Sequence, residues 1–255
     1  MINITITYPR LLRKQLKVLR LTHPSKWTDV TSPQMEMIGR LMAGDVKEID
    51  VIKTFLGTSP RIVKKLDAFH NYKLGELLNF ISEQEPLSYF IIDGFDGYMA
   101  PMPKLADITF AEFIVMDTFY IDYNSDPENI GLLDNFLAVL FVQHTENKRP
   151  RFTNEYDAGF AKTLKGWQIQ TALTNYGLVR IWLQDAFPEV FGKKTDDNTD
   201  TKQKKQSNGW LDVFDSIVGD DLVHSDDYAN KPVTEVLRWL NKKIIDNRKQ
   251  KAKNK

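Results

Sequence analysis

The chain has 255 residues, and its 42% hydrophobic and 11% aromatic content excludes wholesale disorder, because it supplies enough apolar surface for a core. Lysine plus arginine and aspartate plus glutamate both number 34, which excludes a net charge that would draw the whole chain to nucleic acid or to an anionic membrane. The chain has no cysteine, which excludes disulfides, thiolate zinc sites and cysteine nucleophiles and suits a reducing cytoplasm.

The N-terminal residues predict a short strand followed by a basic helix. Ile2, Ile4 and Ile6 alternate with polar residues, which is typical of a half-buried strand, and Pro9 marks its end. We interpret residues 11–21 as an amphipathic helix that ends before Pro24, because they are apolar and basic without a single acid. Cations in such a segment can neutralise phosphates, although a solvated helix face is the commoner role. The candidate nucleic-acid contacts are Arg10, Arg13, Lys14, Lys17 and Arg20.

Helical signals dominate the rest of the first 192 residues. Thr31 or Ser32 can cap a helix that begins at Pro33, and Thr109 and Glu112 have the spacing of a capping box. Residues 87–94 are the single hairpin candidate, because β-branched and aromatic residues meet an Asp-Gly turn there. The predicted helices cover about residues 33–43, 45–56, 60–69, 72–82, 109–123, 126–141 and 165–186. We therefore predict a mainly α, bundle-like body over residues 1–192, with the helix after residue 126 at its centre.

A polar segment separates this body from the C-terminus. Residues 193–208 contain no apolar side chain, which predicts a flexible linker. Residues 209–255 contain two short apolar helix faces and a basic tail, and such a piece must dock on the body, pair with itself or hold a partner. Packing within the chain and partner binding both fit these faces. The partner-binding candidates are Trp210, Phe214, Ile217, Val236 and Trp239.

No pattern of catalytic or metal-binding residues stands out. The histidines are far apart, and none has a second ligand at helical spacing; they are His23, His70, His144 and His224. Residues 93–97 resemble a turn more than a calcium loop, and the four aspartates within residues 220–227 are more often a solvated loop than a cation site. Residues 192–195 lack the first glycine of a phosphate loop. We therefore expect no catalytic residue, no metal, no cofactor and no enzymatic activity.

Five segments, taken in order, resemble proteins encoded in the structural gene region of tailed phages and prophages, near the tail tape-measure gene. They are Trp27-Thr-Asp-Val-Thr-Ser-Pro-Gln34, Asp107-Ile-Thr-Phe-Ala-Glu-Phe113, Leu132-Leu-Asp-Asn-Phe-Leu-Ala-Val-Leu140, Phe187-Pro-Glu-Val-Phe191 and Gly209-Trp210. By similarity to tail assembly chaperones, the resemblance implies a protein that binds the tape measure while the tail tube forms.

Such a role requires a helical body with exposed apolar grooves and no catalytic group. We expect a phage morphogenesis protein that works in the bacterial host cytoplasm, with the tape measure or another virion protein as partner. Alternatives are a structural virion component, such as a head-tail connector or ring subunit that contacts copies of itself, and, with less support, a nucleic-acid-binding helical protein. An enzyme whose site is assembled only by folding is a third class. No apolar run is long enough to span a bilayer, so we expect no membrane partner.

Overall fold

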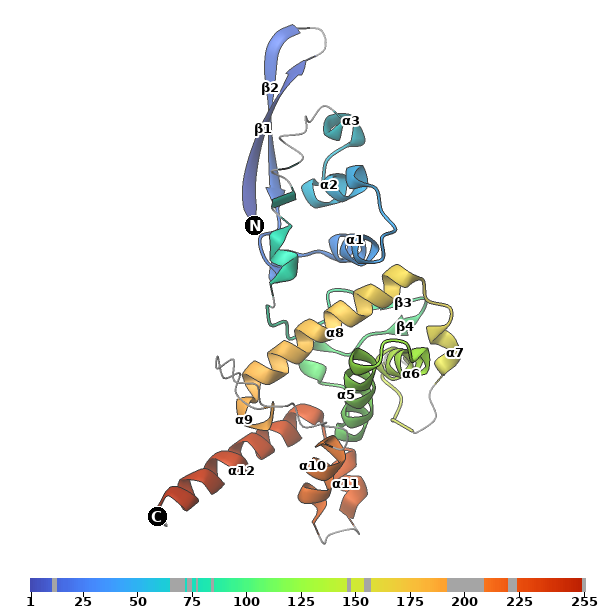
Figure 1. Cartoon of the computed structure of the whole chain (residues 1–255), viewed down its shortest axis with the longest axis vertical. Coiled ribbons are helices and arrows are strands. Elements are labelled where there is room, and N and C mark those ends of the chain that lie inside the picture. The colour runs from blue at the N-terminus through green and yellow to red at the C-terminus, as the bar shows by residue number, and fades with distance from the viewer. Residues whose placement is uncertain are drawn as a thin grey trace. The chain divides into compact units, whose positions relative to one another are not determined.

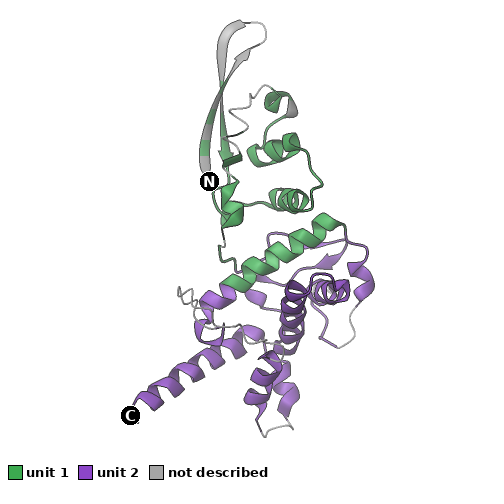
Figure 2. Ribbon diagram, viewed as in Figure 1, with its two compact units in different colours: residues 1–87, 165–181 green, residues 88–164, 182–255 purple. Residues whose placement is uncertain are grey.

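The computed structural model describes residues 1–10, 13–64, 72, 75–76, 78–83, 85–145, 148–153, 157–191, 209–219 and 224–253 (Figure 1). These residues are mainly helical, which confirms the predicted fold class. Contacts divide the chain into two compact units, unit 1 with residues 1–87 and 165–181 and unit 2 with residues 88–164 and 182–255 (Figure 2). The predicted linker, residues 193–208, lies outside the described residues, as do His70, Asp220 and Asp221.

Unit 1 combines an N-terminal β-hairpin with helices. Its elements are β1 (Ile2–Arg10), β2 (Arg13–His23), η1 (Trp27–Asp29), α1 (Ser32–Met42), α2 (Glu48–Leu56), α3 (Pro60–Val63), η2 (Asn79–Ser82) and the larger part of α8 (Gly166–Ala186).

The basic segment forms a strand, so its prediction as a helix was wrong. β2 pairs antiparallel with β1, with Ile2 opposite His23 at one end and Arg10 opposite Arg13 at the other. Val18, Arg20 and Thr22 are exposed, whereas Leu21 is half-buried and His23 is buried, which fits the two-residue period of a strand. Pairing with β1 satisfies the backbone of both strands and outweighs the helical reading of the same residues. The candidate nucleic-acid residues are therefore spread over a hairpin and do not form one helical face.

α1 begins as predicted and meets α8 closely. Thr31 is its N-cap, and the Thr31 backbone N–H donates to Gln34 Oε1 at 2.9 Å. A Cβ atom at Gly39 would lie 2.0 Å from Thr171 Oγ1 and 2.5 Å from the Trp167 carbonyl oxygen. Only glycine permits this approach of the two helices.

Unit 2 contains a small sheet and the remaining helices. The sheet has the antiparallel order β3-β4-β5. Its elements are β3 (Gly94–Phe95), β4 (Tyr98–Met99), η3 (Pro103–Leu105), α5 (Phe110–Ser125), α6 (Ile130–Leu140), β5 (Val142–Gln143), α7 (Ala158–Ala161), α9 (Pro188–Phe191), α10 (Gly209–Val218), α11 (Ser225–Ala229) and α12 (Val233–Lys253).

The predicted hairpin exists, but its strands are shifted along the sequence. β3 starts only at Gly94, and the turn lies at Asp96 and Gly97 rather than at Asp93 and Gly94. Asp96 and Gly97 have φ angles of 49° and 85°, which are the left-handed conformations that a two-residue hairpin turn requires.

α5 and α6 carry the core of unit 2. Leu137 and Phe136 on α6 are fully buried, which agrees with the predicted central position of this helix. Glu112 on α5 forms a buried ion pair with Arg149, whose Nε lies 2.7 Å from Glu112 Oε1. Arg149 also donates from Nη2 to the Val139 carbonyl oxygen at 2.6 Å, so it caps the end of α6. No spacing in the sequence indicates this pair, because its members are 37 residues apart.

Candidate functional site

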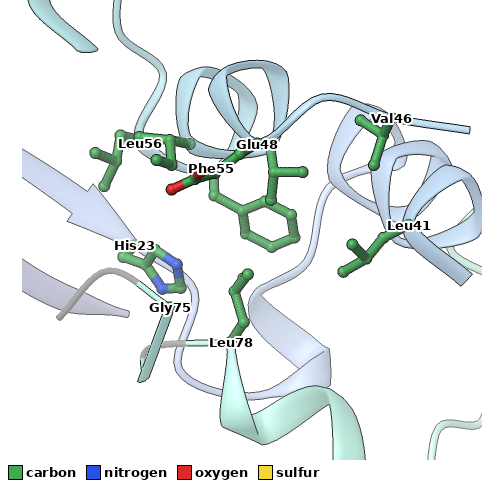
Figure 3. A pocket seen from close by; sticks show the side chains of 10 residues that line it. His23, Leu41, Val46, Glu48, Phe55, Leu56, Gly75 and Leu78 are labelled. Atoms are coloured by element: carbon green, nitrogen blue, oxygen red, sulfur yellow. The ribbon is translucent and has the colours of Figure 1, made fainter. Parts of the chain in front are cut away.

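An open apolar pocket of about 250 Å³ lies in unit 1, which we call the unit 1 pocket (Figure 3). It is formed by the end of β2, the facing sides of α1 and α2, and residues just before η2. The residues that line it are His23, Leu41, Val46, Glu48, Val51, Ile52, Phe55, Leu56, Gly75 and Leu78.

Apolar side chains dominate this lining. Figure 3 shows Phe55 projecting from α2 into the middle of the space, with Leu78 below it and Leu41 and Val46 to one side. Leu41 remains 42% exposed, so the pocket has an apolar rim that reaches solvent. Glu48 is the single carboxylate among the described residues that line the pocket. The arrangement can receive an apolar side chain from outside.

His23 supplies a buried polar group of the lining. It is 2% exposed, and its ring stacks on Phe55 with the centroids 5.5 Å apart. Burial lowers the pKa of His23, and the contact of its Nδ1 with the Pro24 carbonyl oxygen opposes this effect only in part. Burial therefore favours the neutral imidazole over the charged one. The strand pairing that brings His23 to this lining was not predicted from the sequence.

Two of the partner-binding candidates are half-buried and contact α5. Trp210 Nε1 donates to Asp117 Oδ2 at 2.8 Å, and the Trp210 ring meets Phe113 edge-on at 4.9 Å. Phe214 lies 6.3 Å from Phe110. Both side chains therefore hold α10 on α5, which is the in-chain role that the sequence had left open.

The other three candidates come together in a second, smaller pocket within unit 2, which we call the C-terminal pocket. Ile217 from α10 and Val236 and Trp239 from α12 line it with Tyr228, Lys231 and Glu235, and its volume is about 130 Å³. Val236 is buried, whereas Trp239 is 45% exposed. The Lys243 Nζ atom lies 4.6 Å from the centre of the Trp239 ring. This site has room for one side chain of a partner.

Among the nucleic-acid candidates, the structure describes the side chain of Arg20, which is exposed and lies opposite Thr5 in the hairpin. The side chains of Arg10, Arg13, Lys14 and Lys17 lie outside the described residues, so the nucleic-acid prediction stays a prediction.

Within the described part of the chain, no three acidic, histidine or cysteine side chains gather where they could hold a metal ion. None of the helices in that part is both long and apolar enough to cross a bilayer. Comparisons with protein-family models, with curated proteins and with solved structures found no match. The resemblance to proteins encoded near the tape-measure gene therefore rests on the five sequence segments alone.

Proposed function

We propose that the chain is a non-enzymatic morphogenesis protein of a tailed phage, which holds an apolar segment of the tape-measure protein in the host cytoplasm during tail assembly. The observation that carries the proposal is the unit 1 pocket, an open apolar space beside an exposed leucine. Such a surface can cover a partner's apolar side chain that would otherwise promote aggregation. The five segments that resemble proteins encoded near the tape-measure gene support the tape measure as this partner.

The size of the pocket suits a reversible contact. Burial of one leucine or phenylalanine side chain stabilises a complex by about 1.5–3 kcal/mol. Micromolar affinity corresponds to about 8 kcal/mol. One anchor in a pocket of about 250 Å³ is therefore too weak by itself, and binding requires further contacts around it. A holder that must release its partner into the growing tail benefits from such distributed, weak contacts.

Two neighbouring residues of α1 provide a matched test. Leu41 and Met42 are 42% and 44% exposed, but only Leu41 lines the pocket. We expect Leu41→Glu to weaken clearly the ability of the chain to keep the tape-measure protein of the same genome in solution. Met42→Glu, which adds the same charge in the same turn, should leave that ability intact. The readout is light scattering from purified tape measure at equal molar amounts of chain.

Equal effects of the two substitutions would contradict the role of the pocket. Mass spectrometry of purified particles tests the alternative of a structural virion component. A chaperone should be absent from the particle, whereas a stoichiometric presence would favour a connector or ring subunit.

A further inference from the structure

The exposed half of α12 carries an uneven charge. Residues 242–253 contain six basic residues and one acid, Asp246. Residues 242, 243 and 246–253 are exposed. At about 100° per residue, Lys242, Lys249 and Lys253 project within about 40° of one another, on the side opposite to the buried Leu237 and Leu240. We call these three lysines the α12 stripe.

The stripe begins beside the C-terminal pocket. Trp239, at the rim of that pocket, lies less than one helical turn before Lys242. At about 1.5 Å per residue, Lys249 and Lys253 lie about 15 and 21 Å farther along the helix from Trp239. The α12 stripe therefore continues along the helix from the apolar rim of the C-terminal pocket.

We propose that this surface binds an extended acidic segment of a partner protein that carries one apolar anchor. The anchor enters the space between Ile217, Val236 and Trp239. Carboxylates up to about six residues away, at about 3.3 Å per residue, then reach the lysines of the stripe. Anchors of this kind supply most of the affinity of an interface, and the surrounding charges steer the approach and fix the register.

The surface fits an acidic peptide better than a nucleic acid. Glu235 and Asp246 lie on the same side of α12 as the stripe, and they would repel a continuous phosphate backbone. Lys243 already covers a face of the Trp239 ring, where a base would stack. A peptide can space its carboxylates to avoid both acids, whereas a phosphate backbone cannot.

The inference goes beyond the proposed function, because it concerns other residues in another unit. The probe is a fluorescein-labelled peptide with one leucine followed by three Glu-Glu-Gly repeats, and fluorescence anisotropy measures its binding to the full chain. We expect at least tenfold weaker binding for the triple variant Lys242→Glu/Lys249→Glu/Lys253→Glu and at least fivefold weaker binding for Trp239→Ala. Binding by the unchanged chain should weaken as salt is added.

The control triple variant, Lys53→Glu/Lys162→Glu/Lys165→Glu, replaces three exposed lysines outside α12, so the net charge of the chain changes by the same amount. It should bind the peptide as the unchanged chain does. Leu41→Glu should also bind the peptide normally, so failure of the unit 1 pocket and failure of this surface can be told apart. Equal losses in the two triple variants, or a peptide that binds equally well without its leucine, would overturn the proposal. Tighter binding of a 20-base-pair DNA than of the peptide would also overturn it and assign the stripe to nucleic acid.

Discussion

The buried ion pair of Glu112 and Arg149 allows a quantitative stability prediction. The two side chains are 3% and 2% exposed, so neither charge has water to compensate it. Removal of one partner from such a pair costs about 3–5 kcal/mol, because the remaining charge stays buried alone. We expect Arg149→Met to lower the free energy of unfolding of unit 2 by this amount. Urea titration followed by circular dichroism measures the loss.

Two control variants separate the charge from other effects. The double variant Glu112→Gln/Arg149→Met leaves no unpaired charge, and the remaining loss should be about 1–3 kcal/mol for the carbonyl oxygens of Val139 and Leu140 that Arg149 also contacts. Glu36→Gln breaks an ion pair with Arg40 whose members are 41% and 31% exposed, and it should cost no more than about 0.5 kcal/mol.

The pH dependence of the Arg149→Met variant gives a further check. Burial already raises the pKa of Glu112, and Arg149 works against this rise. Without Arg149 the pKa rises further, so the folded variant takes up a proton more readily than the unfolded chain as pH falls. Its stability deficit should therefore shrink between pH 8 and pH 5. A loss below about 1 kcal/mol, or a double variant no more stable than the single one, would refute this reasoning.

Three other predictions concern single residues. Gly39→Ala should destabilise unit 1 by about 1–3 kcal/mol in thermal melts, because the new Cβ would overlap Thr171. The control Gly166→Ala should be tolerated, because its Cβ would meet only Ala43, at 4.0 Å. Leu137→Asp should cost about 4 kcal/mol or more, since it buries an unpaired charge in α6, and a soluble variant with unchanged melting would contradict this. His23 has a lowered pKa, so the unfolded chain binds its proton first and unit 1 should lose stability as pH falls through 6.5; His23→Gln should abolish that dependence in urea titrations.

The starts of helices and the most apolar helix face were predicted best from the sequence. Thr31 is the N-cap of α1, and Thr109 and Glu112 form the predicted capping box of α5, so residues within about one helical turn determine each start. Leu137 and its neighbours make most of the circumference of α6 apolar, so this helix requires burial whichever elements pack against it.

Features that depend on distant residues were predicted poorly. β2 forms a strand because it pairs with β1. The alternation of apolar and polar residues within β2 alone covers too few residues to exclude a helix. The unit 1 pocket joins His23, Leu41, Phe55 and Leu78 from separate elements, and no spacing in the sequence links them. The spacing of Trp210 and Phe214 placed both on one side of a helix, but it did not reveal that α5 would cover that side.

Photocrosslinking tests the central claim most directly. The chain has no cysteine, so Leu41→Cys creates a single attachment point for a benzophenone label at the rim of the unit 1 pocket. Lys162→Cys places the same label on an exposed position in unit 2 as a control. After illumination with the tape-measure protein, mass spectrometry should find crosslinks from position 41 to one apolar segment of that protein and few from position 162. Equal, scattered crosslinks from both positions, or none from position 41, would contradict the proposal that the unit 1 pocket holds the tape measure.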